Sequence, residues 1–316
     1  CLLQQYGPAM RNLLLELGKK HILVLTPSLE YIWKLVGFDG LKSLWQGLVA
    51  IDRLNKIACH LRPYELHHGE TARAYKRGLK LIEDGLATDR LKANLAEIKA
   101  DFKNIKVRQE DRPIIGVAGD IYTRQNYFAN NYLFERLEAL GCEVWPSPFI
   151  IEEVDFTFSR GLYETLSEGK LIHSLAFAGL NLIKERKRRQ VQRKLDVTDL
   201  EIREPDFKEL VKFTTTYLNY DNNQSLFLNV ARMVDFARKG ADGLINVICF
   251  NCMLGLTSAA ISSRIKSDFE NLPIPTLIYG ETENTSASSR LEAFVEQVKA
   301  RYRKKKLNQA FNRDRY

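Results

Sequence analysis

A largely apolar run at 244–248, flanked by glycines, predicts a buried β-strand. Such a run is typical of a parallel strand that is covered on both faces. A turn that carries Cys249 and Cys252 follows it, and we expect a helix to begin near Thr257. Ligands in open α/β sheets bind just beyond the carboxyl ends of the strands, so this turn is the first candidate site. The N-terminus of the following helix would favour a thiolate there.

Four other short apolar segments predict strands, at 21–25, 112–119, 142–145 and 274–279. After the second of these, we expect a loop at 120–126 and a helix at about 128–140 that ends at Gly141. The order strand, loop, helix, glycine and strand indicates a parallel crossover unit. One rim of the resulting sheet is expected to carry three loops, 119–126, 249–256 and 280–286.

Apolar residues at helical spacing predict the helices between these strands. In the segment 40–61 they recur at intervals of three and four, which is typical of a helix with a buried face, and Pro63 ends it. The other predicted helices span 4–18, 69–85, 88–104, 158–196, 224–239 and 289–301, with one more that starts at Pro205.

Together these elements predict an α/β fold with two parallel-sheet lobes, the first of them truncated. The expected parts are a remnant of the first lobe at 1–39, a helical connector at 40–111, and a second lobe at 112–316 with a helical insertion at 155–239. A chain of 316 residues is long enough to bury cores of this size.

The charge balance leaves two interpretations open. Forty-seven basic and 39 acidic side chains give a net charge of +8, and much of the excess lies at 184–194 and 301–315. These runs could contact nucleic acid or an acidic partner, or they could be solvated helix faces. Few aromatic residues are interleaved with them, which disfavours nucleic acid. No apolar run approaches the roughly 18 residues of a membrane span, so no membrane partner is expected.

Cysteine usage favours a reducing compartment. Five cysteines are an odd number and too sparse for a secreted disulfide scaffold, so we expect a cytoplasmic protein. The chain begins at Cys1, with no initiator Met and no signal peptide. A lipid-modified mature N-terminus would begin in this way, but the next residues lead directly into a predicted helix and leave no polar tether. A fragment of a longer chain is therefore the expectation.

The Cys-x-x-Cys motif formed by Cys249 and Cys252 suits a redox dithiol, half of a zinc site or part of an iron–sulfur site. Packing as a small hydrophobic residue competes with these roles for Cys249, which lies closer to the strand. Cys252 lies in the turn and is favoured as a ligand. For Cys59 and Cys142, core packing is the expected role.

The loop after the strand at 112–119 offers the side chains of Tyr122, Arg124 and Asn126. They could bind an anionic group, because arginine is the natural partner of phosphate. Alternatively, Arg124 could pair with Glu135 or Asp120 and brace the loop. Neither a dinucleotide-binding fingerprint nor a P-loop is present, and no nucleophile elbow indicates a hydrolase.

Several segments resemble one family. The motifs Gly-Ala-Asp-Gly-Leu-Ile-Asn-Val and Phe-x-Cys-Met-x-Gly within 240–255, and Arg-Leu-Glu-Ala-Phe at 290–294, resemble the closing module of the 2-hydroxyacyl-CoA dehydratase superfamily. The chain is most similar to the dehydratase-like module of the large activase-related proteins, without their ATPase domain. Further similar segments are Cys-x-x-x-Gln-Tyr at 1–6, Trp-x-Gly-Leu-Val-Ala at 45–50, Arg-Pro-Tyr-Glu at 62–65, Gly-Glu-Thr at 69–71, Arg-Pro-Ile-Ile-Gly-Val-x-Gly at 112–119 and Tyr-x-Arg-x-Asn-x-Phe-Ala-Asn at 122–130.

The resemblance implies two Rossmann-like lobes that hold a [4Fe-4S] cluster between them through cysteines from each. The positions that match the family's ligands are Cys1 and Cys252, while Cys249 stands where relatives have Pro and is a candidate substitute ligand. Two departures from the family pattern are Leu2 to Gln4 in place of Arg-Phe-Gly and Leu254 in place of Pro. They call retention of the cluster into question.

The leading hypothesis is an iron–sulfur electron-transfer module of a dehydratase/activase-like system. The resemblance implies that it passes low-potential electrons to a chemically difficult reduction or dehydration. If the chain is a whole enzyme, the resemblance implies a lyase or a reductase. The expected partners are an ATP-dependent activase domain or subunit, an acyl-CoA or other small-molecule substrate, and a second copy of the chain in a homodimer. The alternative is a non-catalytic α/β interaction scaffold of that system that has lost its cluster.

Overall fold

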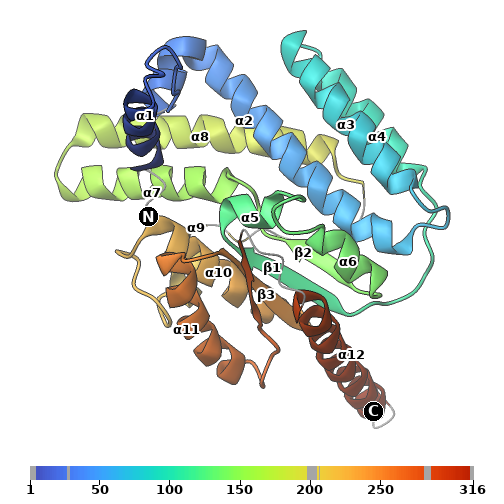
Figure 1. Ribbon diagram of the computed structural model, residues 1–316. Helices are drawn as coiled ribbons and strands as arrows, with labels where there is room; N and C mark the ends of the chain where they lie inside the picture. Colours follow the sequence, from blue (N-terminus) through green and yellow to red (C-terminus); the bar gives the residue numbers. More distant parts are fainter. Residues whose placement is uncertain (1–4, 27–28, 198–204, 206, 281–285, 314–316) are drawn as a thin grey trace.

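A computed structural model describes residues 5–26, 29–197, 205, 207–280 and 286–313 (Figure 1). Within these ranges, helices surround a parallel four-stranded sheet in the order β2-β1-β3-β4. The strands are β1 (Ile114–Gly119), β2 (Glu143–Pro146), β3 (Gly243–Cys249) and β4 (Thr276–Tyr279). The mixed α/β class is confirmed, and so are the four strands predicted from residue 112 onward.

The sheet is covered on both faces, as its apolar strands require. One face packs against α6 (Leu133–Ala139) and α12 (Ser286–Arg313), and the other against α10 (Gln224–Arg238) and α11 (Met253–Asp268). Ile115 and Val117 of β1 face the first group, while Ala118 of the same strand faces the second. The alternation of side chains along a strand therefore divides β1 between two cores.

The order of the strands creates a switch point between β1 and β3. From β1 the chain passes through α6 to β2 on one side, and from β3 it passes through α11 to β4 on the other side. These two connections lie on opposite faces of the sheet. The loops that leave β1 and β3 therefore diverge, and such a point in a parallel sheet leaves room for a ligand at the carboxyl edge.

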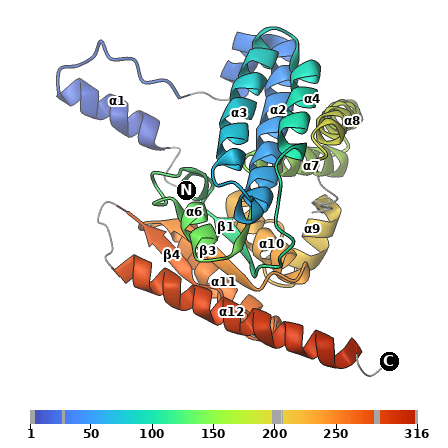
Figure 2. The ribbon, with the colours of Figure 1, turned by 90° about the vertical axis from the view of Figure 1, so that its right-hand side faces the viewer.

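A helical layer covers the β2 side of the sheet. It contains α2 (Leu29–Leu61), α3 (Glu70–Ala87) and α4 (Leu91–Lys103), and its apolar core also includes side chains from α7 (Ile151–Ser167) and α8 (Leu171–Lys194) (Figures 1 and 2). The indole of Trp45 in α2 donates a hydrogen bond of 3.0 Å to the carbonyl of Lys184 in α8. A 3-10 turn, Arg62–Tyr64, ends α2, and α9 (Phe207–Thr214) packs beside α7 and α10.

The strand expected at 21–25 does not form. These residues follow α1 (Tyr6–Glu16) as irregular chain, and Leu23 is 78% exposed. No neighbouring strand pairs with them in the described part of the chain, and apolar character alone does not make a strand. Figure 2 shows α1 set apart from the helical layer. None of the helices described is long and apolar enough to cross a membrane.

Several helix boundaries differ from the expected ones. The loop expected at 120–126 contains a short helix, α5 (Ile121–Gln125), and α6 begins at Leu133 rather than near residue 128. The helix α11 begins at Met253, before Thr257. The helix expected at 158–196 is two helices, α7 and α8, which are separated at Gly169, where φ is +69°.

Gly119 allows β1 and β3 to approach closely at their carboxyl ends. Its φ is +125°, and a Cβ atom at this position would lie 1.9 Å from the carbonyl oxygen of Val247. The amide of Asp120 donates a hydrogen bond of 2.7 Å to that same oxygen. A side chain at residue 119 would therefore push the two strands apart where the loops diverge.

We predict that Gly119→Ala lowers the free energy of unfolding by about 3–5 kcal/mol, because it combines a strained φ with a backbone clash. Gly141→Ala is the matched control, since Gly141 also has a positive φ but nothing within 4 Å of its Cβ position. The control should cost only about 1–2 kcal/mol. Urea denaturation of both variants measures the difference, and equal losses would contradict the close approach.

Candidate functional site

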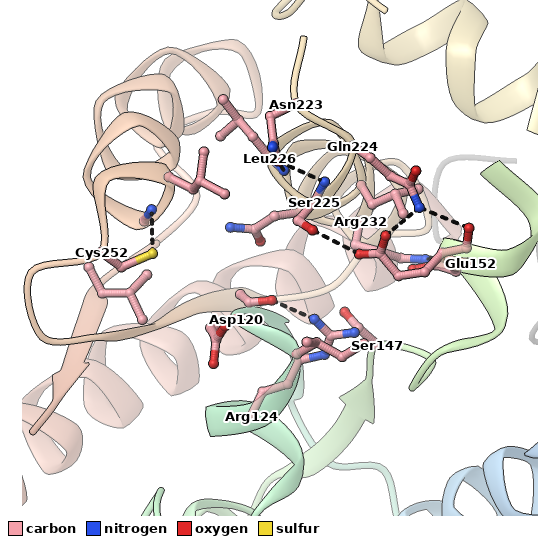
Figure 3. Close-up of a pocket in the computed structure, with 18 of the residues that line it drawn as sticks. Asp120, Arg124, Ser147, Glu152, Asn223, Gln224, Ser225, Leu226, Arg232 and Cys252 are labelled. Atoms are coloured by element: carbon pink, nitrogen blue, oxygen red, sulfur yellow. Dashed lines mark hydrogen bonds and ion pairs between the residues drawn. The ribbon is translucent and has the colours of Figure 1, made fainter. Parts of the chain in front are cut away.

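A cavity of about 480 Å³ lies at the carboxyl edge of the sheet, at the switch point between β1 and β3 (Figure 3). The ends of three strands and the first turns of α7, α10 and α11 surround it. The residues that line it are Gly119, Asp120, Ile121, Arg124, Ser147, Phe149, Glu152, Glu153, Asn223, Gln224, Ser225, Leu226, Leu228, Asn229, Arg232, Ile248, Cys252, Leu254 and Gly255.

Arg124 braces the wall of this cavity. The carboxylate of Asp120 caps α5 by accepting a hydrogen bond of 2.8 Å from the amide of Thr123, which places Arg124 against the sheet edge. The Arg124 guanidinium donates to the carbonyl oxygen of Gly119 and, at 2.6 Å, to that of Pro148. Arg124 is 7% exposed, and this burial lowers its pKa from the ordinary value.

Bracing of this loop was one of the two roles expected of Arg124, but the partners are different. The guanidinium bonds two backbone carbonyls. The arrangement joins the end of β1 to the loop after β2, because the two carbonyl groups belong to those segments.

Tyr122 and Asn126 lie away from the cavity. The Asn126 amide donates a hydrogen bond of 2.9 Å to the Tyr122 hydroxyl, and Tyr122 is 64% exposed. Neither side chain lines the cavity. Of the three residues expected to bind a ligand, the structure brings only Arg124 to the switch point.

Cys249 and Cys252 lie at the two ends of one tight turn. The amide of Cys252 donates a hydrogen bond of 3.2 Å to the carbonyl of Cys249, and Asn251 within the turn has a φ of +55°. Both thiols are free and half-buried. The Cys252 sulfur accepts a hydrogen bond of 3.4 Å from the Gly255 amide, so it caps α11 at its N-terminus and faces the cavity.

The neighbouring Cys252 influences the ionisation of the Cys249 thiol. Burial is the main cause that raises the pKa of Cys249 to about 11, and the neighbouring Cys252 and Asp120 raise it further. The pair therefore forms one chemical unit at the end of β3.

The two other cysteines that the structure describes, Cys59 and Cys142, do not contribute to this unit. Cys1 lies outside the described residues. Cys59 and Cys142 are fully buried in the core beneath α6 and α12, as expected, and burial raises the pKa of both thiols. They can serve as internal controls for the chemistry of the exposed turn.

A buried charge network beside the cavity was not expected from the sequence. Arg232 of α10 forms an ion pair with Glu152 of α7 and another, at 2.9 Å, with Asp235. Asp235 also binds Lys239 at 2.8 Å. A signal was present, because Arg232 and Asp235 interrupt an otherwise apolar stretch of helix at a spacing of three residues.

The role of Asn246 was also not predicted from the sequence. It lies within the largely apolar run of β3 and is fully buried. Its amide donates a hydrogen bond of 3.0 Å to the Ser258 hydroxyl, and its carbonyl oxygen accepts one of 3.0 Å from Asn229. One strand and two helices are thus tied together immediately below the cavity, where an unpaired amide would be costly.

The turn offers two thiols, the kind of side chain that holds iron–sulfur clusters. Such clusters are held by cysteine thiolates, and backbone amides that donate to the sulfur atoms tune them. Cys249 and Cys252 provide two sulfur atoms, one of which already accepts an amide hydrogen bond. Among the described residues, no three His, Cys, Asp or Glu side chains are close enough to bind a metal together. Any further ligand must come from elsewhere.

Comparison with known proteins found no match. No protein-family model, no curated protein and no solved structure is similar to this chain at a significant level.

We predict that Cys249 in the reduced, iron-free protein reacts slowly with iodoacetamide at neutral pH. A raised pKa leaves little thiolate, so its rate should still rise about tenfold per pH unit near pH 9.5, where an ordinary thiol has levelled off. Tandem mass spectrometry of the tryptic peptide 240–264 separates Cys249 from Cys252. The unfolded protein is the control, and a plateau below about pH 9 in the folded state would contradict the burial of this thiol.

Proposed function

We propose that this chain is the iron–sulfur module of a 2-hydroxyacyl-CoA dehydratase/activase-like system. In this proposal the parallel sheet is the second of two Rossmann-like lobes. Cys249 and Cys252 hold one side of a [4Fe-4S] cluster, and Cys1 is the third ligand implied by the resemblance. When bound, the cluster would supply low-potential, one-electron chemistry.

The observation that carries the proposal is the pair of free thiols in one turn at the switch point. Two features of this turn suit a cluster. The Gly255 amide donates to the Cys252 sulfur, a contact of the kind that tunes cluster sulfurs, and the turn follows a strand that is held in register with β1 and β4. A rigid strand and a helix N-terminus therefore fix the positions of both sulfur atoms.

The cavity gives this site a place for a small molecule. Cys252 lines one wall, while Arg124 and the Glu152–Arg232 ion pair line the opposite side (Figure 3). In the proposal the cavity takes the reacting part of an acyl-CoA or another small substrate. Arg124 holds the wall in place through the carbonyls of Gly119 and Pro148. The reaction class is that of a dehydratase-like lyase or an ATP-coupled reductase component in the cytoplasm, served by an activase.

A second candidate function is a non-catalytic interaction scaffold of the same system that has lost its cluster. Exposed apolar side chains favour it. On the hairpin of α7 and α8 they include Tyr163, Leu166, Leu171, Ile172, Leu175 and Leu182. A partner such as the activase, or a second copy of the chain, could cover this surface, since large exposed apolar patches mark interaction sites.

We predict that anaerobic reconstitution with iron and sulfide gives a brown protein whose bound iron depends on the turn. Cys252→Ser should lose most of the iron, because it removes the thiolate that accepts the Gly255 amide hydrogen bond. Cys249→Ser should also bind less iron than the unsubstituted chain. Iron, acid-labile sulfide and the visible absorbance spectrum provide the measurements.

Cys142→Ser is the matched control, because Cys142 is buried in the core and away from the turn. It should retain the iron content of the unsubstituted chain. Circular dichroism checks that all three variants are folded. A colourless, iron-free protein after reconstitution would reject the cluster and favour the scaffold, and an unchanged iron content in Cys252→Ser would reject the ligand assignment.

A further inference from the structure

We propose that Cys249 and Cys252 form a reversible disulfide with each other, by exchange with a low-molecular-weight disulfide. This inference needs only the two thiols and does not depend on iron. The modified site is the turn at the end of β3, and the co-reactant is a small dialkyl disulfide of the glutathione class.

The geometry of the turn brings the two residues within bonding range. The hydrogen bond of 3.2 Å from the Cys252 amide to the Cys249 carbonyl closes a four-residue turn. Such turns bring their first and last Cα atoms within about 7 Å, and disulfides span about 4.4–6.8 Å between Cα atoms. Cys249 and Cys252 are therefore placed at the two ends of the turn, at a Cα separation that a disulfide can span.

The turn is open to a small co-reactant. Phe250, its second residue, is 69% exposed, and Asn251 beside it is also exposed. The thiols at both ends are half-buried, whereas those of Cys59 and Cys142 are fully buried. An incoming disulfide can therefore reach this turn but not the other two described cysteines.

The surroundings of the two sulfur atoms assign them different steps. Cys252 lies at the N-terminus of α11, and its sulfur accepts the Gly255 amide hydrogen bond and faces the cavity. It is the attacking group. Cys249 ends the strand, is paired with Tyr279 of β4, and does not line the cavity. It is the resolving group.

The exchange balances without another reagent. The Cys252 thiolate attacks one sulfur of the small disulfide, whose S–S bond breaks and releases one thiol after protonation. Cys249 then loses its proton and attacks the Cys252 sulfur of the mixed disulfide, and a second thiol leaves. Two protein thiols are oxidised to one disulfide, and one small disulfide is reduced to two thiols.

The disulfide would exclude iron from the turn, because a cluster requires both sulfurs as thiolates. The proposed site would then load its cluster only under reducing conditions. If the proposal of an iron–sulfur cluster is wrong, the proposal of a disulfide still stands, because the test below uses iron-free protein.

The test incubates the reduced, iron-free chain with oxidised glutathione, blocks the remaining thiols by alkylation and analyses the tryptic peptide 240–264. This peptide should become lighter by two hydrogen atoms and lose both alkylation sites, and excess reduced glutathione should restore them. A peptide that remains doubly alkylated, or that carries glutathione on each cysteine without an internal bond, would overturn the proposal.

Two variants test the order of attack. Cys249→Ser should trap glutathione on Cys252, because the resolving thiol is missing, and absence of this adduct would reject Cys252 as the attacking group. Cys142→Ser is the matched control and should form the internal disulfide to the same extent as the unsubstituted chain. A loss of the disulfide in that control would show that it does not arise from the turn.

Discussion

The candidate site depends on the close approach of β1 and β3 at their carboxyl ends. Gly119 lies against the Val247 carbonyl, at a distance that leaves no room for a side chain. The Asp120 amide then bonds that carbonyl, and the chain turns away into α5. On the other strand, β3 continues to Cys249 before its own turn. The two loops therefore diverge from a fixed point, and the cavity lies between them.

Polar contacts between distant segments keep this cavity in shape. Arg124 links the end of β1 to the loop after β2 through two carbonyl groups. The carboxylate of Asp52 in α2 accepts a hydrogen bond of 3.1 Å from the Phe149 amide in the same loop. The helical layer is thereby connected to the cavity wall. A shift of α2 would move this loop, and with it one side of the site.

The strands from residue 112 onward could be predicted from the sequence, because a strand covered on both faces is apolar along most of its length. It also predicted that the segments after β1 and β3 meet, and Asp120 and Cys252 do line one cavity. The third expected loop, 280–286, lies largely outside the described residues. The prediction of a strand at 21–25 was wrong. Whether a strand forms depends on pairing with a neighbouring strand, and the sequence of a single segment does not encode that pairing.

The charged part of the site could not be predicted from local patterns. Glu152 and Arg232 are 80 residues apart, and only the packing of α7 against α10 brings them together. The hydrogen-bond partners of Arg124 could not be predicted either, because backbone carbonyls leave no signature in a sequence. Asn246 was the exception. A single amide within a buried apolar run signals a polar contact, since an unpaired amide would destabilise the core.

The central claim is that the sulfur atoms at the end of β3 bind iron beside the switch-point cavity. Anomalous X-ray diffraction at the iron absorption edge, from crystals of the anaerobically reconstituted chain, tests it most directly. The account predicts iron density bonded to the sulfurs of Cys249 and Cys252, next to the cavity wall formed by Gly255. Iron bound elsewhere on the chain, or no iron density at these two sulfurs in fully reconstituted crystals, would contradict it.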